Sequence, residues 1–139
     1  ENKRVEIVFE PTNVQIIGNR GFLGHMISNF IDNAIKYNVV GGKVIISLGK
    51  TEKGVSYLSV EDTGVGIDES HIEFIFDRFY RVDDSRNRAT GGTGIGLTIC
   101  KKIATLHGGD ITVESQLEKG TKFTVIFNRN NTLKEDKND

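Results

Sequence analysis

The sequence predicts an α+β fold, a two-layer α/β sandwich in which helices cover one face of a mixed, mostly antiparallel sheet. Strand-like and hairpin-like segments are interrupted by two long helical segments, without the regular alternation of strand and helix that a parallel sheet requires. Hydrophobic residues make up 37% and charged residues 27% of the 139 residues, which suits one ordinary globular core. We therefore expect one domain over residues 1–128 and a disordered polar tail over 129–139.

Extended segments flank a long helix in the first half of the chain. Apolar and polar side chains alternate in the extended segments, which predicts strands. Asn19 can cap a helix whose apolar residues fall within one sector, and Gly41-Gly42 breaks that pattern. The expected elements are strands over 4–10, 14–17, 43–48 and 55–61, and a helix over 20–37.

The second half contains two helical segments and a closing hairpin. Residues 69–76 are expected to form a short helix. Residues 77–92 are charged and polar without periodicity, which predicts a long loop that is a lid, a binding loop or a disordered segment. A second long helix is expected over about 94–107, ended by Gly108-Gly109. The closing hairpin is expected to pair strands over 110–115 and 122–127.

Charge and cysteine content narrow the classes of function. A net charge of −1 gives no general attraction to nucleic acid or to an anionic membrane, so we expect neither as a partner. Cys100 is the single cysteine and cannot form an internal disulfide, which favours a reducing, cytoplasmic location. No apolar run approaches 18 residues, so we expect no segment that crosses a bilayer and no direct membrane contact. We also expect the isolated domain to be monomeric. The chain begins at Glu1 without a methionine, so we interpret it as part of a longer protein, which a membrane anchor elsewhere could hold.

A polar stripe follows the helix predicted over 20–37. Asn29, Asn33, Lys36 and Tyr37 stand at i, i+4, i+7 and i+8, on one side of the helix. Mg²⁺ takes oxygen ligands and commonly shares them with substrate phosphates, and an Asn carboxamide supplies such an oxygen without adding charge. A lysine one turn further on could neutralise phosphate oxygens. From spacing alone, a solvated polar face remains the preferred interpretation.

Two glycine-rich segments follow this helix. Asp62-Thr-Gly-Val-Gly-Ile67 stands at the end of a strand, where a carboxylate can accept a hydrogen bond from the 6-amine that adenine has and guanine lacks. Gly64 and Gly66 would let the backbone approach a flat base, although an ordinary turn is the simpler explanation. Residues 91–97 lead into the second long helix, whose first N–H groups suit phosphates. This segment fits neither a P-loop nor the Gly-x-Gly-x-x-Gly pattern.

Taken in order, these segments resemble the conserved boxes of sensor histidine kinases. Together they run from about residue 20 to 125, in the order and spacing of that family. The N box corresponds to Asn29–Tyr37, the first glycine box to Asp62–Ile67, the F box to Phe76–Arg81, the second glycine box to Gly92–Leu97, and the final Gly-Thr-x-Phe element to Gly120–Phe123.

The resemblance implies the ATP-binding fold shared with DNA gyrase, mismatch-repair ATPases and certain chaperones. It also implies that the γ-phosphate of Mg-ATP passes to a histidine on a separate dimerisation and phosphoacceptor domain, and from there to an aspartate of a response regulator. Asn33 would bind Mg²⁺ with Asn29 beside it, Lys36 would face the phosphates, and Tyr37 would line the nucleotide pocket. Residues 77–92 would be the ATP lid.

The remaining implied roles concern the two ends of the nucleotide. Asp62 would take the adenine amine, directly and through water, with Thr121 nearby. Arg81 would reach the terminal phosphates and, with Asn29 and Lys36, make up the catalytic group. Further nucleotide contacts are expected from Gly64, Gly66, Ile67, Gly92, Thr93, Gly94, Gly96 and Leu97.

Two positions depart from patterns of related families. Asn38 stands where sensor kinases usually have a small hydroxyl residue, and no proline follows it, so we expect an effect on local loop geometry only. Asn29 stands where hydrolysing relatives and related serine kinases carry a glutamate base, four residues before the metal-binding asparagine. Because an amide cannot take a proton, this position argues against efficient activation of water. It suits transfer to an imidazole, which needs little help from a base.

Two alternatives to a histidine kinase remain open at the level of the sequence. An ATPase or serine kinase with the same fold, or a nucleotide sensor without enzymatic activity, would contain similar boxes. His25, His71 and His107 lie outside the His-Glu or His-Asp context of a phosphoacceptor, so we expect structural or surface roles for them. Cys100 is expected to be a small core residue rather than a nucleophile.

Overall fold

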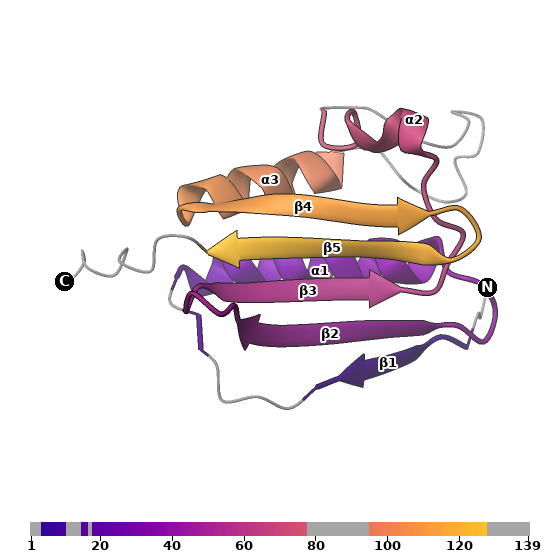
Figure 1. Cartoon of the computed structure of the whole chain (residues 1–139), viewed down its shortest axis with the longest axis horizontal. Helices are drawn as coiled ribbons and strands as arrows, with labels where there is room; N and C mark the ends of the chain where they lie inside the picture. Colours follow the sequence, from indigo (N-terminus) through magenta and orange to yellow (C-terminus); the bar gives the residue numbers. More distant parts are fainter. Residues whose placement is uncertain (1–3, 11–14, 17, 78–94, 128–139) are drawn as a thin grey trace, which may run out of the picture.

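Five strands form one sheet in the order β1-β2-β3-β5-β4, and α1 and α3 pack on one of its faces (Figure 1). The computed structural model describes residues 4–10, 15–16, 18–77 and 95–127. β1 and β2 are parallel and all other neighbouring strands are antiparallel, which confirms the predicted α+β sandwich. The elements are β1 (Glu6–Phe9), α1 (Arg20–Lys36), β2 (Lys43–Lys50), β3 (Ser56–Asp62), α2 (Glu69–Ile72), α3 (Ile95–Leu106), β4 (Gly109–Gln116) and β5 (Gly120–Phe127).

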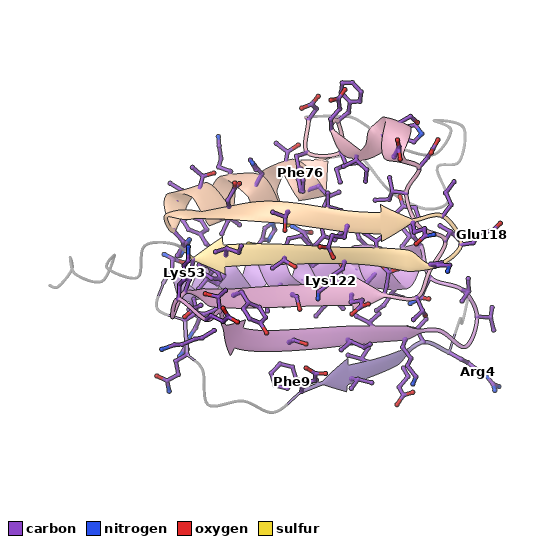
Figure 2. All side chains as sticks on the ribbon, in the orientation of Figure 1. Arg4, Phe9, Lys53, Phe76, Glu118 and Lys122 are labelled. Atoms are coloured by element: carbon purple, nitrogen blue, oxygen red, sulfur yellow. The ribbon has the colours of Figure 1, made fainter. Side chains whose placement is uncertain are left out.

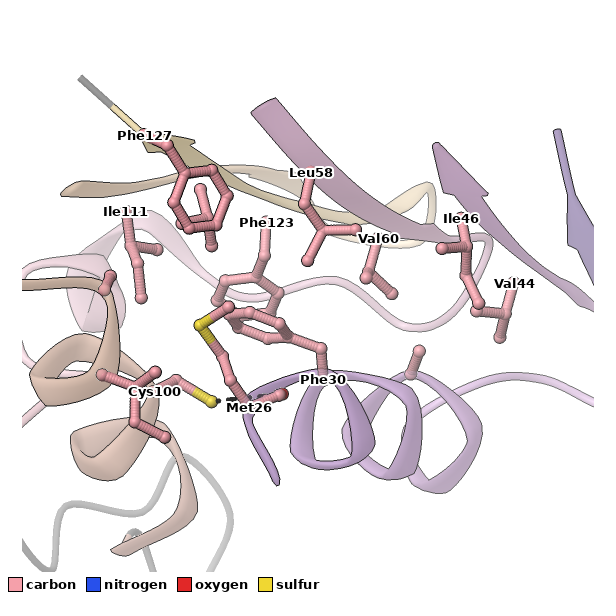
Figure 3. Close-up of a cluster of buried hydrophobic side chains, with 14 of the residues drawn as sticks. Met26, Phe30, Val44, Ile46, Leu58, Val60, Cys100, Ile111, Phe123 and Phe127 are labelled. Atoms are coloured by element: carbon pink, nitrogen blue, oxygen red, sulfur yellow. Dashed lines mark hydrogen bonds between the residues drawn. The ribbon is translucent and has the colours of Figure 1, made fainter. Parts of the chain in front are cut away.

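The core lies between the sheet and the two long helices (Figure 3). Phe30 of α1 stacks on Phe123 of β5 with ring centroids 5.2 Å apart, and Met26 lies one turn before Phe30 on the same face of the helix. Cys100 joins this cluster from α3, and its thiol lies 3.6 Å from the Met26 carbonyl. Because this packing fixes the rotation of α1, it also fixes where the polar stripe of that helix points.

The start of α1 is tied to the end of α3. Asn19 caps α1 as predicted, its side chain accepting from the Phe22 N–H at 2.9 Å. The Asn19 N–H donates to Nε2 of His107 at 2.9 Å, and Nδ1 of the same ring lies 2.9 Å from the Ile103 carbonyl. A neutral imidazole protonated at Nδ1 satisfies both contacts. His107 therefore has the structural role expected from the sequence.

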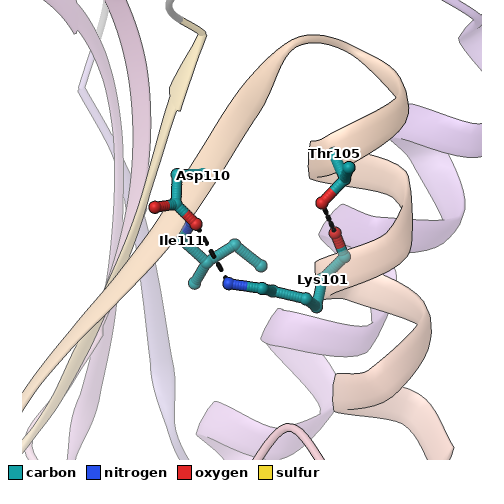
Figure 4. A network of polar contacts seen from close by, with 4 residues as sticks. All are labelled: Lys101, Thr105, Asp110 and Ile111. Atoms are coloured by element: carbon teal, nitrogen blue, oxygen red, sulfur yellow. Dashed lines mark hydrogen bonds and ion pairs between the residues drawn. The ribbon is translucent and has the colours of Figure 1, made fainter.

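An exposed ion pair connects α3 with β4 (Figure 4). Nζ of Lys101 lies 3.0 Å from Oδ1 of Asp110, and the same oxygen accepts from the Ile111 N–H at 2.9 Å. The hydrogen bond from Lys101 lowers the pKa of Asp110, and the bond from the Ile111 backbone acts in the same direction. Both side chains remain about half exposed to solvent.

Some predicted elements differ from the structure or lie outside the described residues. The helix expected over 69–76 ends at Ile72 because the following residues form tight turns, with bonds such as Phe74 N–H to the His71 carbonyl, which bring Ile75 into the core. Of the strand expected over 14–17, only residues 15 and 16 are described, and neither is in a strand. Residues 78–92 of the expected lid, residue 94 at the expected start of the second long helix, and the whole tail lie outside the described residues.

Candidate functional site

Many of the predicted site residues gather at one end of the sheet, on the right in Figure 1, where α1 and β3 end and β4 turns into β5. Residues 62–67, here called the β3 turn, lie between the end of α1 and the turn that joins β4 to β5. Val65 donates its N–H to the Tyr37 carbonyl at 3.0 Å, and Glu118 donates its N–H to the Val65 carbonyl at 2.8 Å. Glu118 lies in the turn between β4 and β5 at this end of the molecule (Figure 2). Three segments distant in sequence therefore form one unit.

Asp62 is the buried acidic residue of this unit. It is 8% exposed, and its Oδ1 accepts from the Gly64 N–H at 2.8 Å and from the Thr121 N–H at 3.2 Å. Burial raises the pKa of Asp62, the two backbone hydrogen bonds act in the opposite direction, and the charge of Glu61 adds to the increase. The described residues donate no hydrogen bond to Oδ2. The carboxylate is therefore fixed by one oxygen and can accept an N–H of a ligand with the other.

Packing against backbone explains the glycines of the β3 turn. A Cβ atom at Gly64 would collide with the Tyr37 carbonyl oxygen. Gly66 has a φ of +78°, and a Cβ there would collide with the Gln116 carbonyl oxygen. Neither neighbour is a flexible side chain that could move away, so both positions require glycine before any ligand is considered. Their expected role, close approach to a flat base, stays a prediction.

Ser115 belongs to the unit, although the sequence analysis did not single it out. Its Oγ accepts from the Ile67 N–H at 2.7 Å, lies 2.7 Å from Oγ1 of Thr121, and donates to the Gly120 carbonyl at 3.0 Å. The backbone N–H of Ile67, a residue expected to contact the nucleotide, is therefore already used within the protein. One signal in the sequence could have identified Ser115. It is a hydroxyl residue that continues the alternating row of Ile111 and Val113, the side chains that β4 turns toward the core.

Asn38 has a wider role than the local effect expected from the sequence. It is 4% exposed, its Nδ2 donates to the Lys43 carbonyl at 2.9 Å, and its Oδ1 accepts from the Val39 N–H at 2.8 Å. The Thr63 hydroxyl lies 3.2 Å from the same Oδ1 and accepts from the Lys43 N–H at 2.9 Å. Asn38 thus connects the end of α1 and the start of β2 with the residue that follows Asp62. The expectation of an effect confined to the loop is corrected by these contacts.

The polar stripe of α1 lies beside its buried face. The buried face consists of Met26, Phe30 and Ala34. The predicted stripe residues are all half-buried, namely Asn29, Asn33, Lys36 and Tyr37. The structure therefore places them along the border of the core, where a polar side chain is partly withdrawn from water, rather than on a fully solvated face.

Asn29 contains an unpaired polar atom. Its Nδ2 is buried and has no hydrogen-bond partner. Burial raises the pKa of Cys100 to about 12. The Asn29 side chain lies against the Cys100 thiol and lowers this pKa by a smaller amount. A thiol with this pKa stays protonated at neutral pH, which fits the predicted core role of Cys100. The neighbour of Nδ2 is the sulfur of Cys100, which is a weak acceptor, so this donor faces the core.

The residues along the stripe fit a metal-bound phosphate better than a metal alone. Among the described residues, no group of three or more His, Cys, Asp or Glu side chains could hold a metal ion. Magnesium tolerates such a poor set of protein ligands because it keeps several waters and shares phosphate oxygens. The Asn33 carboxamide, the unpaired Asn29 donor and the Lys36 cation are the right chemical types for that arrangement.

Several expected phosphate contacts cannot be located. Arg81, Gly92, Thr93 and Gly94 lie outside the described residues. Gly96 and Leu97 are in the first turn of α3, and Leu97 packs against the core.

Within the described part of the chain, no helix is both long enough and apolar enough to cross a membrane.

Phe76 anchors the segment that leads into the expected lid (Figure 2). Its ring meets Phe123 edge-on at 6.1 Å between centroids, and Nζ of Lys101 lies 5.9 Å from the Phe76 ring centre. The Thr98 hydroxyl donates to the Phe76 carbonyl at 2.9 Å. The start of the F-box segment is therefore attached both to the core and to α3.

Comparison with known proteins gives the same family from sequence and from structure. Residues 18–131 match the family described as "Histidine kinase-, DNA gyrase B-, and HSP90-like ATPase". Sensor histidine kinase RppB of Synechocystis sp. is 48% identical over 108 residues, which cover 78% of this chain and 24% of RppB. Signal transduction histidine-protein kinase ArlS of Staphylococcus aureus is 49% identical over 98 residues, covering 70% and 22%. The chain thus spans about a quarter of the length of these relatives.

Two solved structures have the same fold. The mycobacterial sensor histidine kinase MprB has a TM-score of 0.74 and 30% identity, covering 89% of this chain and 82% of MprB. Full-length ShkA, solved in complex with AMPPNP, has a TM-score of 0.74 and 29% identity, covering 90% of this chain and 26% of ShkA. Since the family match spans most of the chain and includes the unit around Asp62, the chain belongs to the histidine kinase-, DNA gyrase B- and HSP90-like ATPase family.

Proposed function

We propose that this chain binds Mg-ATP and transfers its γ-phosphate to a histidine on a separate dimerisation domain of a sensor histidine kinase. The phosphate would then pass to an aspartate of a response regulator. The observation that supports this best is the geometry of Asp62, which is buried, held by two backbone N–H groups at Oδ1 and offers Oδ2 to a ligand. Family membership supports the same function, and the related ShkA was solved with AMPPNP.

The nucleobase end would be formed by the β3 turn and its neighbours. Oδ2 of Asp62 would accept the 6-amine of adenine, with Thr121 beside it and Tyr37 along the pocket wall. Because Asp62 is taken out of water, an amine that replaces the lost solvent recovers a hydrogen bond to a charged group. This is the physical reason why the site would prefer a base with an amine at this position.

The phosphate end would be formed by α1 and the start of α3. Asn33 would hold Mg²⁺, Asn29 would stand beside it, and Lys36 would face phosphate oxygens. The metal would supply charge neutralisation to the phosphates. Arg81 and the glycine-box residues are proposed in the roles given by the family resemblance, which are the terminal phosphates for Arg81 and backbone contacts for Gly92, Thr93, Gly94, Gly96 and Leu97.

The type of acceptor follows from Asn29. An amide in the position of a glutamate base cannot take a proton from water, so the chain would hydrolyse ATP slowly by itself. A neutral imidazole attacks without a strong base, and catalysis would rest on positioning and on charge neutralisation. An ATPase or serine kinase would need a base that Asn29 does not provide, which places that alternative second.

The decisive experiment is phosphotransfer to the histidine-bearing segment of the full-length protein. This chain is mixed with that segment and γ-labelled Mg-ATP, and the stability of the label is then measured. We expect acid-labile, base-stable phosphate on the segment, and none when Asp62→Ala replaces the wild type. No label despite measured ATP binding would contradict the proposal and favour a nucleotide sensor, whereas brisk hydrolysis by the chain alone would favour an ATPase.

A further inference from the structure

Ser115 makes three contacts with one hydroxyl, and these contacts assign the direction of each hydrogen bond. An N–H can only donate, so Ser115 accepts from Ile67. A carbonyl can only accept, so the single Ser115 proton points to Gly120. The remaining contact is 2.7 Å between Oγ of Ser115 and Oγ1 of Thr121, and it is a hydrogen bond only if Thr121 donates its proton to Ser115. This is the arrangement that satisfies all three contacts at once.

Thr121 is the neighbour of Asp62 across two paired strands. The two residues are directly opposite each other in the pairing of β3 with β5, and the Thr121 N–H donates to Asp62 at 3.2 Å. Both side chains are buried, and each continues the apolar row of its strand toward the helices. With its proton directed at Ser115, Thr121 presents only lone pairs on its other side, and Oδ2 of Asp62 presents lone pairs as well.

We infer that Ser115 is a positioning residue which fixes the Thr121 hydroxyl as an acceptor and so adds selectivity for nucleotides with a 6-amine over those with a 6-oxo group. The inference rests on the proposed nucleotide site. An amine has two hydrogens and can satisfy both acceptors, directly or through one water. A 6-oxo group brings a third acceptor to the same place, where it finds no proton, and the adjacent N1–H of such a base can satisfy one of the two protein acceptors but not both.

Without the Ser115 hydroxyl, Thr121 is free to turn and donate. Its proton then has no partner in Ser115, and rotation about one bond directs it toward a ligand carbonyl. The penalty against a 6-oxo base falls by about one hydrogen bond between neutral groups, which corresponds to a factor of about 3 to 10. Affinity for a 6-amine base changes less, because Asp62 still accepts from it.

The test compares ATP with inosine triphosphate, which has a 6-oxo group and an N1–H in place of the 6-amine and the unprotonated N1 of adenine, in calorimetric titrations of the whole chain with Mg²⁺. We expect the wild type to prefer ATP, Ser115→Ala to reduce the ratio of the two affinities about 3- to 10-fold, and Ser115→Thr to restore it. In a Thr121→Val background, Ser115→Ala should leave the ratio unchanged, because its effect passes through Thr121. Thermal unfolding confirms that each variant is folded.

The possible outcomes separate this inference from the proposed function. Equal weakening of both nucleotides by Ser115→Ala would show a merely structural role and overturn the inference alone. An unchanged ratio in Ser115→Ala, or a further change of the ratio in the Thr121→Val background, would also overturn it. A folded wild type that binds neither nucleotide would overturn the proposed function and the inference with it.

Discussion

The two ends of the candidate site are built in opposite ways. At the nucleobase end, the backbone N–H groups of Gly64, Val65 and Ile67 are all used within the protein, by Asp62, Tyr37 and Ser115. At the phosphate end, Asn29 keeps a buried donor without a partner, beside half-buried polar residues of the same helix. The backbone of the nucleobase end is thus hydrogen-bonded before a ligand arrives and leaves Oδ2 of Asp62 for the ligand, whereas the phosphate end consists of polar side chains along one helix.

This difference indicates how each end contributes to binding. A site whose hydrogen bonds already exist does not have to be ordered by its ligand, so it can select the base at little cost. A site of uncharged carboxamides and one cation depends on the metal ion that it shares with the ligand's oxygen atoms. Changes at the nucleobase end should therefore alter which nucleotide binds, whereas changes along the α1 stripe should alter how binding depends on magnesium.

The largest effect is expected from Asp62. Asp62→Ala should lower ATP affinity about 100-fold, because it removes a charged acceptor from a buried position, and should leave the chain folded. Glu61→Ala, at the exposed neighbouring position, is the matched control and should change affinity little. Calorimetry and circular dichroism measure the two properties. Unchanged ATP affinity in Asp62→Ala would remove the base from this position.

Asp62 also predicts a dependence on pH. Its folded-state pKa is raised, so ionisation costs stability as the pH rises through and above the ordinary value of 3.8. Asp62→Asn, which keeps an oxygen for the two backbone N–H groups, should therefore be at least as stable as the wild type at pH 7 while binding ATP weakly. ATP binding should weaken on acidification at a higher pH than for an ordinary aspartate. A marked loss of stability in Asp62→Asn would contradict this reasoning.

The next largest effect is expected from Asn33 and concerns magnesium. Asn33→Ala should lower ATP affinity in the presence of Mg²⁺ by at least about 10-fold and have little effect in its absence, because only the metal-bound form uses the carboxamide. Asp32→Ala, at the exposed adjacent position, serves as the control. Titrations with and without chelator measure the difference. An equal loss under both conditions would place the magnesium ligand elsewhere.

A smaller effect, on stability, is expected from Asn38. Asn38→Ala should lower the free energy of unfolding by about 1–3 kcal/mol, since the Lys43 carbonyl and the Thr63 hydroxyl lose buried partners. Urea unfolding measures this, and Val40→Ala, at a site that is 77% exposed, is the control. A secondary loss of ATP affinity is expected because Thr63 adjoins Asp62. An Asn38→Ala chain as stable as the control would show that these contacts contribute nothing.

The smallest effect is expected at the ion pair of Lys101 with Asp110. Both side chains are about half exposed, so Lys101→Ala should cost less than about 1 kcal/mol, and less still at high salt. Asp110 has a lowered pKa, so this contribution is present above the ordinary aspartate pKa of 3.8 and is lost as the pH falls through the folded-state value. Urea unfolding at two salt concentrations measures it. A larger loss that salt does not reduce would instead point to the contact of Lys101 with Phe76.

The sequence predicts the elements and the residues whose role follows from local spacing. The α1 stripe is visible because helical periodicity alone brings Asn29 and Asn33 to one side, and Asp62 is visible because it ends a strand. Ser115 and Asn38 are not visible in this way. Their partners Ile67 and Thr63 lie 48 and 25 residues away, and only the packing of the three segments determines those contacts.

The same limit explains the length of α2 and the role of the glycines. Residues 73–76 do not continue the helix because Ile75 is buried in the core, and no local sequence pattern shows that burial. The approach of Gly64 and Gly66 to a base stays a prediction, whereas the need for glycine at both positions follows from carbonyl groups of distant residues that lie against them. Local propensity decides neither case, because tertiary contacts determine both.

Amide hydrogen exchange of the ligand-free chain tests most directly whether the backbone of the nucleobase end is formed before ATP binds. The N–H groups of Gly64 and Thr121, which donate to Asp62, should be protected without nucleotide and should change little when ATP is added. Free exchange of both amides until ATP is added would contradict the account, because the ligand would then order the site that it is said to find already formed.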